Sequence, residues 1–288
     1  MADLVSGQHT EARQRALREL IFYFVLTFVI TFGLGAIIIF FQPEYEAAFG
    51  PIGDPSKSWL YFVAVSSPTI SAVLVSLLFG GLENVKTLFA GLYRPFRLRW
   101  MLVSLLTIPA ALLACALAER YASDAPYSVD LRALVFGPFL WFTTRLLFTD
   151  PGPWGEETGW RGFALPRLLT RFSPLMAAIV LGAIWSTWHT PAFFVSGLSQ
   201  HGLNFVWFMT ANICLTIFMT WIYVNGNRNY LIAGVIPHAV SNLMFIAHAY
   251  NDIEIEAIVY MAIALLIVAA SGPSLRGWRF GQAKPTEL

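Results

Sequence analysis

The sequence predicts an all-α polytopic membrane protein with about eight transmembrane helices, plus an interfacial or re-entrant helix that carries a Glu-Glu motif. Three observations predict it. Hydrophobic residues make up 57% of the 288 residues, whereas soluble domains average about 45–50%. Charged residues make up only 12%, against an average of about 25%. Finally, apolar stretches of about 20 residues, the length that crosses a bilayer, recur along the chain.

The expected spans are separated by charged or polar breaks. The N-terminal spans are expected at residues 20–41, 59–78, 100–117 and 131–148. The C-terminal spans are expected at residues 175–195, 203–224, 230–249 and 255–270. Between the two groups, a Gly- and Pro-rich segment from Asp150 leads into an amphipathic stretch that ends near Arg171. We interpret this stretch as the interfacial or re-entrant helix, or as a continuation of the fourth span, because a ninth crossing would weaken the charge asymmetry of the loops.

The basic residues predict the orientation. Fifteen of the 18 Lys and Arg residues fall on the side of the N-terminus, and only Lys57, Arg120 and Arg132 fall on the other. Since cytoplasmic loops carry the excess of Lys and Arg, both termini are expected to be cytoplasmic. The absence of a eukaryotic sorting signal favours a prokaryotic plasma membrane. No cleaved signal peptide is expected, because the first span is too long for one.

The predicted organisation has no soluble domain. Residues 1–19 form a cytoplasmic amphipathic lead-in, and residues 20–148 the N-terminal transmembrane helices. Residues 149–271 form a helical core that carries the polar motifs, and residues 272–288 a cytoplasmic tail. The function is therefore expected to reside among the helices.

Composition also excludes several classes of protein. A net charge of +1 gives no field that would attract nucleic acid. Cys115 and Cys214 each lie in an apolar run, which is typical of packing residues rather than of a disulfide framework. Neither a His-Glu-x-x-His zinc motif, nor a Walker loop, nor a Gly-x-Ser-x-Gly motif occurs.

The first polar cluster within the apolar sequence is Gly155-Glu-Glu-Thr-Gly-Trp-Arg161. An ionised side chain at the centre of a membrane helix costs about 2.5–3.5 kcal/mol on insertion scales, so such residues mark functional sites. Glu157 and Arg161 are four residues apart and can pair on one helical face. Glu156 points about 100° away from Glu157 and is left without a partner. This makes Glu156 the candidate functional carboxylate.

The second and third clusters contain His189 and the pair His238 and Asn242. Pro191 and Pro237 lack an N–H, so each should bend or open its helix near the neighbouring histidine. Asn242 follows His238 by one turn on the same face. Singly, these residues could simply join helices by hydrogen bonds. Together with Glu156, they form a set that can activate water and stabilise an oxyanion.

Upright helices would place the two histidines at different depths. At about 1.5 Å per residue, His238 lies about 12 Å from the inner end of its span, and His189 about 21 Å from the inner end of its own. A kink at Pro191, a tilt, or a later start of the fifth span is needed to bring the two histidines together.

The order Glu-Glu-x-x-x-Arg, aromatic-x-x-x-His and His-x-x-x-Asn resembles the CAAX protease and bacteriocin-processing (CPBP) family, which includes the type II CAAX prenyl endopeptidases. The resemblance covers about residues 151–249. One departure is Trp185, which stands where the family usually has Phe; an aromatic packing role survives this change. The resemblance implies the following site residues: catalytic Glu156, His189, His238 and Asn242, with Glu157 and Arg161 in support.

The resemblance implies an intramembrane endopeptidase that cleaves a membrane-associated protein or peptide near the cytoplasmic face. Its partners are then the lipid bilayer and that substrate, without nucleic acid. Glu156 would be the base that activates water, with no cofactor expected. Zinc is the alternative, with Glu156, His189 and His238 as ligands. Two other functions compete: a non-catalytic bacteriocin-immunity or scaffolding membrane protein, and a small-solute transporter.

Overall fold

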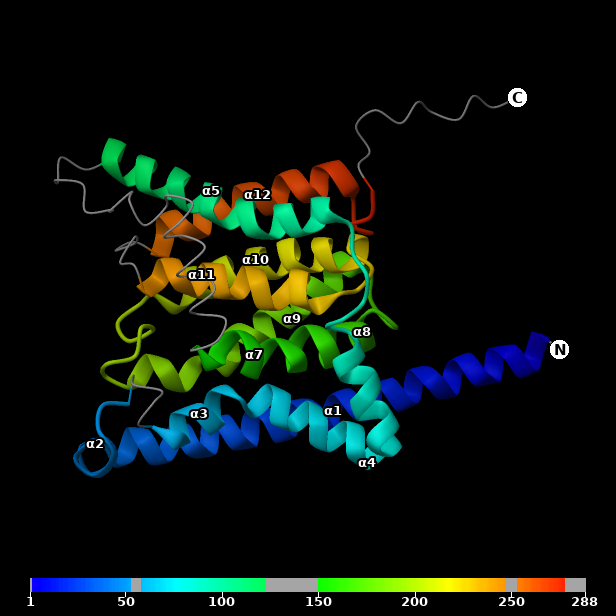
Figure 1. The fold of residues 1–288 in the computed structure, drawn as a ribbon, viewed down its shortest axis with the longest axis horizontal. Helices are drawn as coiled ribbons and strands as arrows, with labels where there is room; N and C mark the ends of the chain where they lie inside the picture. Colours follow the sequence, from blue (N-terminus) through cyan, green and yellow to red (C-terminus); the bar gives the residue numbers. More distant parts are fainter. Residues whose placement is uncertain (1, 53–57, 123–149, 247–252, 278–288) are drawn as a thin grey trace.

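The computed structural model describes residues 2–52, 58–122, 150–246 and 253–277. Every regular element in these ranges is a helix, so the predicted all-α class is confirmed. The long helices run side by side with their axes roughly parallel (Figure 1). The start of α1 and the end of α12 lie at the same end of the bundle (Figure 1). The expected fourth span, at residues 131–148, lies outside the described residues.

The N-terminal half forms the lower part of the bundle in Figure 1, with α5 on the opposite side. Its helices are α1 (Ala2–Phe40), α2 (Gln42–Phe49), α3 (Trp59–Val65), α4 (Ser67–Ala90) and α5 (Leu98–Ala122). The C-terminal half begins with α7 (Pro151–Glu157), the π-helix Thr158–Ala164, α8 (Leu165–Leu168) and α9 (Pro174–Trp188). It continues with the 3₁₀ helix Thr190–Phe194, α10 (Phe205–Asn225), the π-helix Leu231–Val235, α11 (Ile236–Ile246) and α12 (Ile253–Ser271).

The expectation of eight long spans is wrong. Among the described residues, four helical segments are long and apolar enough to cross a membrane: Thr10–Phe40, Ser67–Ala90, Phe205–Asn225 and Ile253–Ser271. The segments Leu98–Ala111 and Leu231–Asn242 are apolar but shorter. The chain is therefore a polytopic membrane protein, although several of its helices stop short of a full crossing. Apolar composition did not predict these shorter helices, because a stretch can be apolar throughout although a proline interrupts the helix within it.

The expected second span is broken at its middle by Pro68. Helix α3 ends at Val65 and α4 begins at Ser67, because Pro68 has no N–H to continue the helical ladder. The break is joined to two other helices by hydrogen bonds. Thr31 on α1 bonds to the Ser67 hydroxyl and accepts a hydrogen bond from the indole Nε1 of Trp188 on α9, at 2.6 Å.

Near Pro191 the fifth span ends rather than bends, which corrects the expected kink. Helix α9 stops at Trp188, and a 3₁₀ turn follows from Thr190. The Thr187 carbonyl, which Pro191 cannot satisfy, accepts a 2.6 Å hydrogen bond from the Thr190 hydroxyl. The expected opening near Pro237 is confirmed, since a π-helix directly precedes α11.

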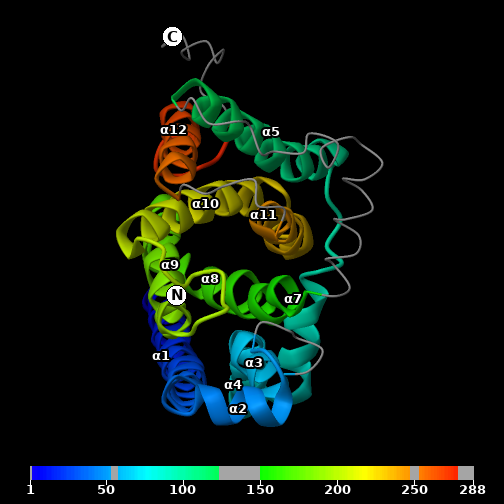
Figure 2. The same cartoon turned by 90° about the vertical axis from the view of Figure 1, so that its left-hand side faces the viewer.

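The segment that carries Glu156 lies inside the bundle, not on its surface as an interfacial helix would. In the end-on view, α7 and α8 occupy the middle, between α3 and α4 on one side and α10 and α11 on the other (Figure 2). Gly155 and Gly159 make this close approach possible. A Cβ on Gly159 would lie 2.5 Å from the Pro68 backbone, and a Cβ on Gly155 would lie 3.0 Å from the Ser66 Cα. Small residues four apart allow helix backbones to pack this closely.

We expect the substitution Gly159→Ala to destabilise the protein by about 1–3 kcal/mol, the usual cost of overpacking, because the added methyl group meets backbone atoms that cannot move aside. Thermal unfolding in detergent measures this. The matched control is Gly33→Ala on α1, where a Cβ would have no atom within 4 Å. Equal unfolding temperatures for the two variants would contradict the prediction.

Candidate active site

Glu156 is held by the side chain of Trp185. The indole Nε1 of Trp185 donates a 2.7 Å hydrogen bond to the Glu156 carboxylate, and Glu156 is 4% exposed. Trp185 lies on α9, and Glu156 lies on α7, so this contact joins two helices of the bundle. A buried indole N–H requires an acceptor, and here the acceptor is the candidate carboxylate.

Trp185 contacts the other candidate residues as well. The ring of Trp185 lies 5.6 Å from the His189 ring and 5.3 Å from the His238 ring, centroid to centroid. The Arg161 guanidinium lies 4.4 Å from the centre of the same indole. From the sequence we assigned Trp185 only a packing role. The signal that could have shown more is a tryptophan one turn before a histidine in an apolar segment, since a buried indole N–H usually finds an acceptor.

Glu157 and Arg161 form the expected ion pair. The Arg161 Nη1 atom donates to Glu157 Oε1 at 2.7 Å, and both side chains are fully buried. Arg161 Nη2 also donates to Thr216 on α10, at 3.1 Å. Neither Glu157 nor Arg161 lines the cavity described below. Their position is that of a buried support beneath the site.

His238 is oriented by this ion pair. Its Nδ1 lies 2.8 Å from Glu157 Oε1, and because a carboxylate accepts, Nδ1 carries the proton. Gly234 makes room for this contact, since a Cβ there would lie 2.5 Å from Glu157 Oε2. The Nε2 edge of His238 remains available to the cavity, which His238 lines.

His189 is oriented by the backbone of its own helix. Its Nδ1 lies 2.9 Å from the Trp185 carbonyl, one turn earlier. A carbonyl can only accept, so Nδ1 is the protonated nitrogen and Nε2 keeps a lone pair. Because α9 ends at Trp188, the imidazole lies at the end of the helix and lines the cavity. His189 can therefore accept a hydrogen bond from a water molecule or a ligand.

Asn242 is oriented by Asp150, which the sequence analysis did not single out. Asn242 Nδ2 donates to Asp150 Oδ2 at 2.8 Å, while Asp150 Oδ1 accepts from the Gly152 N–H and caps α7. A Cβ on Gly152 would lie 3.2 Å from Asn242 Nδ2 and 3.5 Å from Glu156 Oε1. The amide and the carboxylate thus face the same small volume over Gly152. An Asp directly before a Pro-rich helix start is a recognisable N-cap signal.

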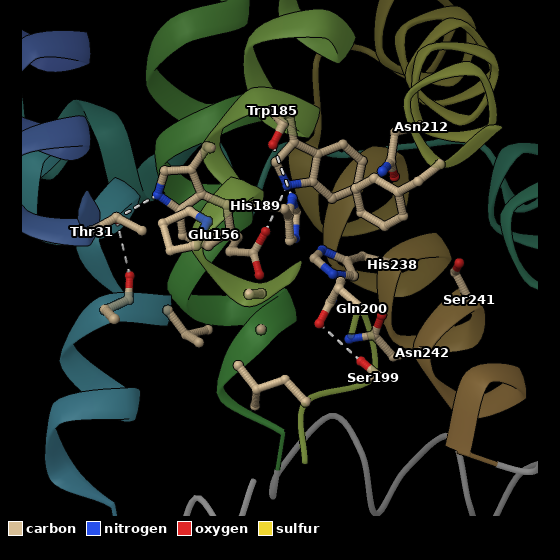
Figure 3. A pocket seen from close by; sticks show the side chains of 18 of the residues that line it. Thr31, Glu156, Trp185, His189, Ser199, Gln200, Asn212, His238, Ser241 and Asn242 are labelled. Carbon is tan, nitrogen blue, oxygen red and sulfur yellow. Dashed lines mark hydrogen bonds between the residues drawn. The ribbon is translucent and has the colours of Figure 1, made fainter. Parts of the chain in front are cut away.

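A single cavity of about 730 Å³ collects these groups. Figure 3 shows Glu156, His189, His238 and Asn242 around it, with Thr31 on the opposite wall. The cavity reaches Gly197 and Ser199, which are exposed in the loop between α9 and α10. Its mouth is therefore at that end of the bundle, and its polar groups lie deeper inside.

The two histidines meet despite their different distances along the chain. Asn229 and Tyr230, which precede the π-helix before α11, are buried and donate hydrogen bonds to the carbonyls of Gly91, Leu92 and Arg94 in the segment after α4. His189 lies beyond the 15 residues of α9, about 22 Å along that helix. Both imidazoles nevertheless line the same cavity, and both rings contact Trp185.

The cavity mouth and the start of α1 lie at opposite ends of the bundle (Figure 1). The candidate site opens at the end of the bundle where α9 finishes and α10 begins.

The alternative mechanism would need Glu156, His189 and His238 to act as zinc ligands. Within the described residues, no group of three His, Cys, Asp or Glu side chains is placed to hold a metal ion. The carboxylate of Glu156 is instead engaged by an indole, and each histidine has one nitrogen engaged by the protein.

We expect Arg161→Met to destabilise the protein by about 3–5 kcal/mol, because it leaves the Glu157 carboxylate buried without its cation. The control is Lys86→Met, which breaks the exposed pair with Glu83 and should cost no more than about 1 kcal/mol. Both are measured by thermal unfolding in detergent. Arg161→Lys should recover only part of the loss, because one ammonium group does not reproduce the two guanidinium contacts. Comparable shifts for Arg161→Met and Lys86→Met would contradict this account.

Comparison with known proteins agrees with the resemblance. Residues 136–244 match the family model described as type II CAAX prenyl endopeptidase Rce1-like. A CAAX prenyl protease 2 from Methanococcus maripaludis is 27% identical over 237 residues, which cover 77% of this chain and 82% of the relative. The matched stretch contains every residue that the sequence assigned to the site. Over residues 136–244 the chain is therefore similar to the Rce1-like type II CAAX prenyl endopeptidases.

Proposed function

We propose that the protein is an intramembrane endopeptidase in which Glu156 activates the attacking water. The observation that carries this proposal is the shared cavity, in which a buried carboxylate, two oriented imidazoles and an amide face one enclosed volume. Peptide hydrolysis needs a base within reach of water and donors for the developing oxyanion. A scaffolding protein has no need of this combination.

Glu156 and His189 act on the water. Glu156 takes the proton from the water as it attacks the peptide carbonyl, and the Trp185 N–H fixes the orientation of the carboxylate. His189, whose Nε2 has a free lone pair, holds the second hydrogen of the same water. The apolar walls exclude other water molecules, which strengthens these interactions.

Asn242 and His238 stabilise the oxyanion. Asn242 Nδ2 has two hydrogens, of which Asp150 accepts one and leaves the other for the substrate. Since His238 Nδ1 already donates to Glu157, His238 can donate from Nε2 only as an imidazolium. The charges then balance, because Glu156 and Glu157 are matched by Arg161 and His238. Glu157 thus plays the part of a carboxylate that stabilises a charged imidazole.

The substrate we propose is a membrane-anchored protein or peptide, by analogy with the CAAX prenyl protease 2 relative. The scissile bond enters from the membrane face at which α9 ends, because the cavity reaches that loop. An apolar anchor on the substrate would be compatible with the aliphatic and aromatic cavity wall near Gly35 and Ile38.

We expect Glu156→Gln to leave the protein folded and to lower its rate of peptide cleavage by about 10²–10⁴-fold, because the amide cannot accept the proton from water. Cleavage is followed with a membrane-protein substrate in proteoliposomes, and folding by thermal unfolding. The control is Glu254→Gln, an exposed carboxylate outside the cavity lining, which should keep the parental rate. Parental activity in Glu156→Gln would overturn the assignment and favour a scaffolding or immunity role.

Metal removal distinguishes the two mechanisms open to this set of residues. Treatment with a strong chelator should leave the cleavage rate unchanged, because the proposed base is Glu156 itself. The rate is measured before treatment, after it, and after addition of zinc. Loss of activity that zinc restores would show that Glu156, His189 and His238 act as ligands.

A further inference from the structure

The catalytic cavity has a second polar wall that the proposed hydrolysis does not use. This wall is formed by α10 and α12, and it contributes Asn212, Glu256 and Tyr260 to the cavity lining. Figure 3 shows Asn212 and Ser241 on the side of the cavity away from Thr31. Glu256 lies one turn before Tyr260, on the same face of α12.

Asn212 has unused hydrogen-bonding capacity in this wall. Its side chain is 9% exposed, and its Nδ2 atom has no hydrogen-bond partner in the described structure. A buried amide without a partner destabilises the free protein, so a ligand that bonds to it gains affinity. Within the cavity, the natural partner of such a donor is a peptide carbonyl.

Glu256 adds an acidic group to the same wall. It is 6% exposed, and none of the ion pairs among the described residues includes it. A carboxylate in apolar surroundings requires a cation or strong donors. The other two lining carboxylates are already engaged, Glu156 by Trp185 and Asp150 by Asn242. Glu256 is hydrogen-bonded to the Tyr260 hydroxyl one turn later but has no cationic partner among the described residues, so a basic group of a ligand would supply the cation that it lacks.

The charge of the whole lining also favours a basic ligand. Of the described residues that line the cavity, three are carboxylic acids and none is Lys or Arg. A positively charged group that enters the cavity meets complementary charge on two sides. The imidazolium that the proposed mechanism places on His238 offsets one of the three carboxylates, and the lining keeps a net negative charge.

We infer that Asn212 and Glu256 form a specificity subsite for a Lys or Arg residue of the substrate, close to the bond that Glu156 hydrolyses. Glu256 binds the basic side chain, and Asn212 Nδ2 donates to the peptide carbonyl of the same residue. This inference rests on the proposed function and adds a substrate preference to it. The subsite acts on binding and selection, and takes no part in the chemical step.

The test uses the full-length protein in detergent and a peptide library made from a proteome with a glutamyl endopeptidase, so that Lys and Arg lie inside the peptides. Mass spectrometry identifies the new cleavage sites. The parental protein and the Glu254→Gln control should show about tenfold enrichment of Lys and Arg at one fixed position from the cleaved bond. Glu256→Gln should lose that enrichment, while cleavage of peptides without a basic residue continues at a rate within about twofold of the parental one.

A second variant covers the case in which Glu256→Gln does not fold. Asn212→Leu, which is close in volume, should reduce the enrichment at the same position by about threefold or more. Enrichment that is absent from the parental protein, or that persists in both variants, would overturn the subsite and leave the proposed function intact. Unchanged cleavage by Glu156→Gln, or failure of the parental protein to cleave the membrane-protein substrate in proteoliposomes, would instead overturn the proposed function and the subsite with it.

Discussion

The buried ion pair between Glu157 and Arg161 is the contact on which the site depends. Two full charges inside an apolar bundle are tolerable only when each finds several partners. Arg161 contacts Glu157, Thr216 and the face of Trp185, and only its Nε atom has no hydrogen-bond partner among the described residues. Glu157 also binds the Nδ1 of His238. Because the indole of Trp185 and the imidazole of His238 are partners of this ion pair, the pair holds both rings in place. The indole in turn holds Glu156.

Interruptions of the helices bring the functional groups together. The two π-helices, Thr158–Ala164 and Leu231–Val235, each end two residues before a proline, Pro166 or Pro237. A wider turn accommodates a carbonyl that proline cannot satisfy, and such turns are common at functional sites. Likewise, α9 stops just before His189 and leaves the imidazole at a helix end. The same features shorten several helices below the length of a membrane span.

The cavity combines two kinds of surface. One wall holds the residues proposed for catalysis, each fixed by a partner from another part of the fold. The wall on α10 and α12 contains Asn212, whose Nδ2 has no partner among the described residues, and Glu256, which has the Tyr260 hydroxyl as a partner but no cation. Such a division is what a selective hydrolase requires, because the reacting groups must be held in place while selectivity comes from groups that remain unsatisfied until the right substrate binds.

The sequence alone determined the all-α membrane class, the pairing of Glu157 with Arg161 and the residues that meet at the cavity, because composition and helical spacing are local properties of the chain. It could not determine the number of full spans, since prolines such as Pro68 and Pro191 end helices within continuous apolar stretches. The roles of Trp185 and Asp150 were decided by tertiary structure, because each depends on a partner far away in the sequence. That His189 and His238 line one cavity was also decided by packing, because their helices are separated by α10 in the sequence.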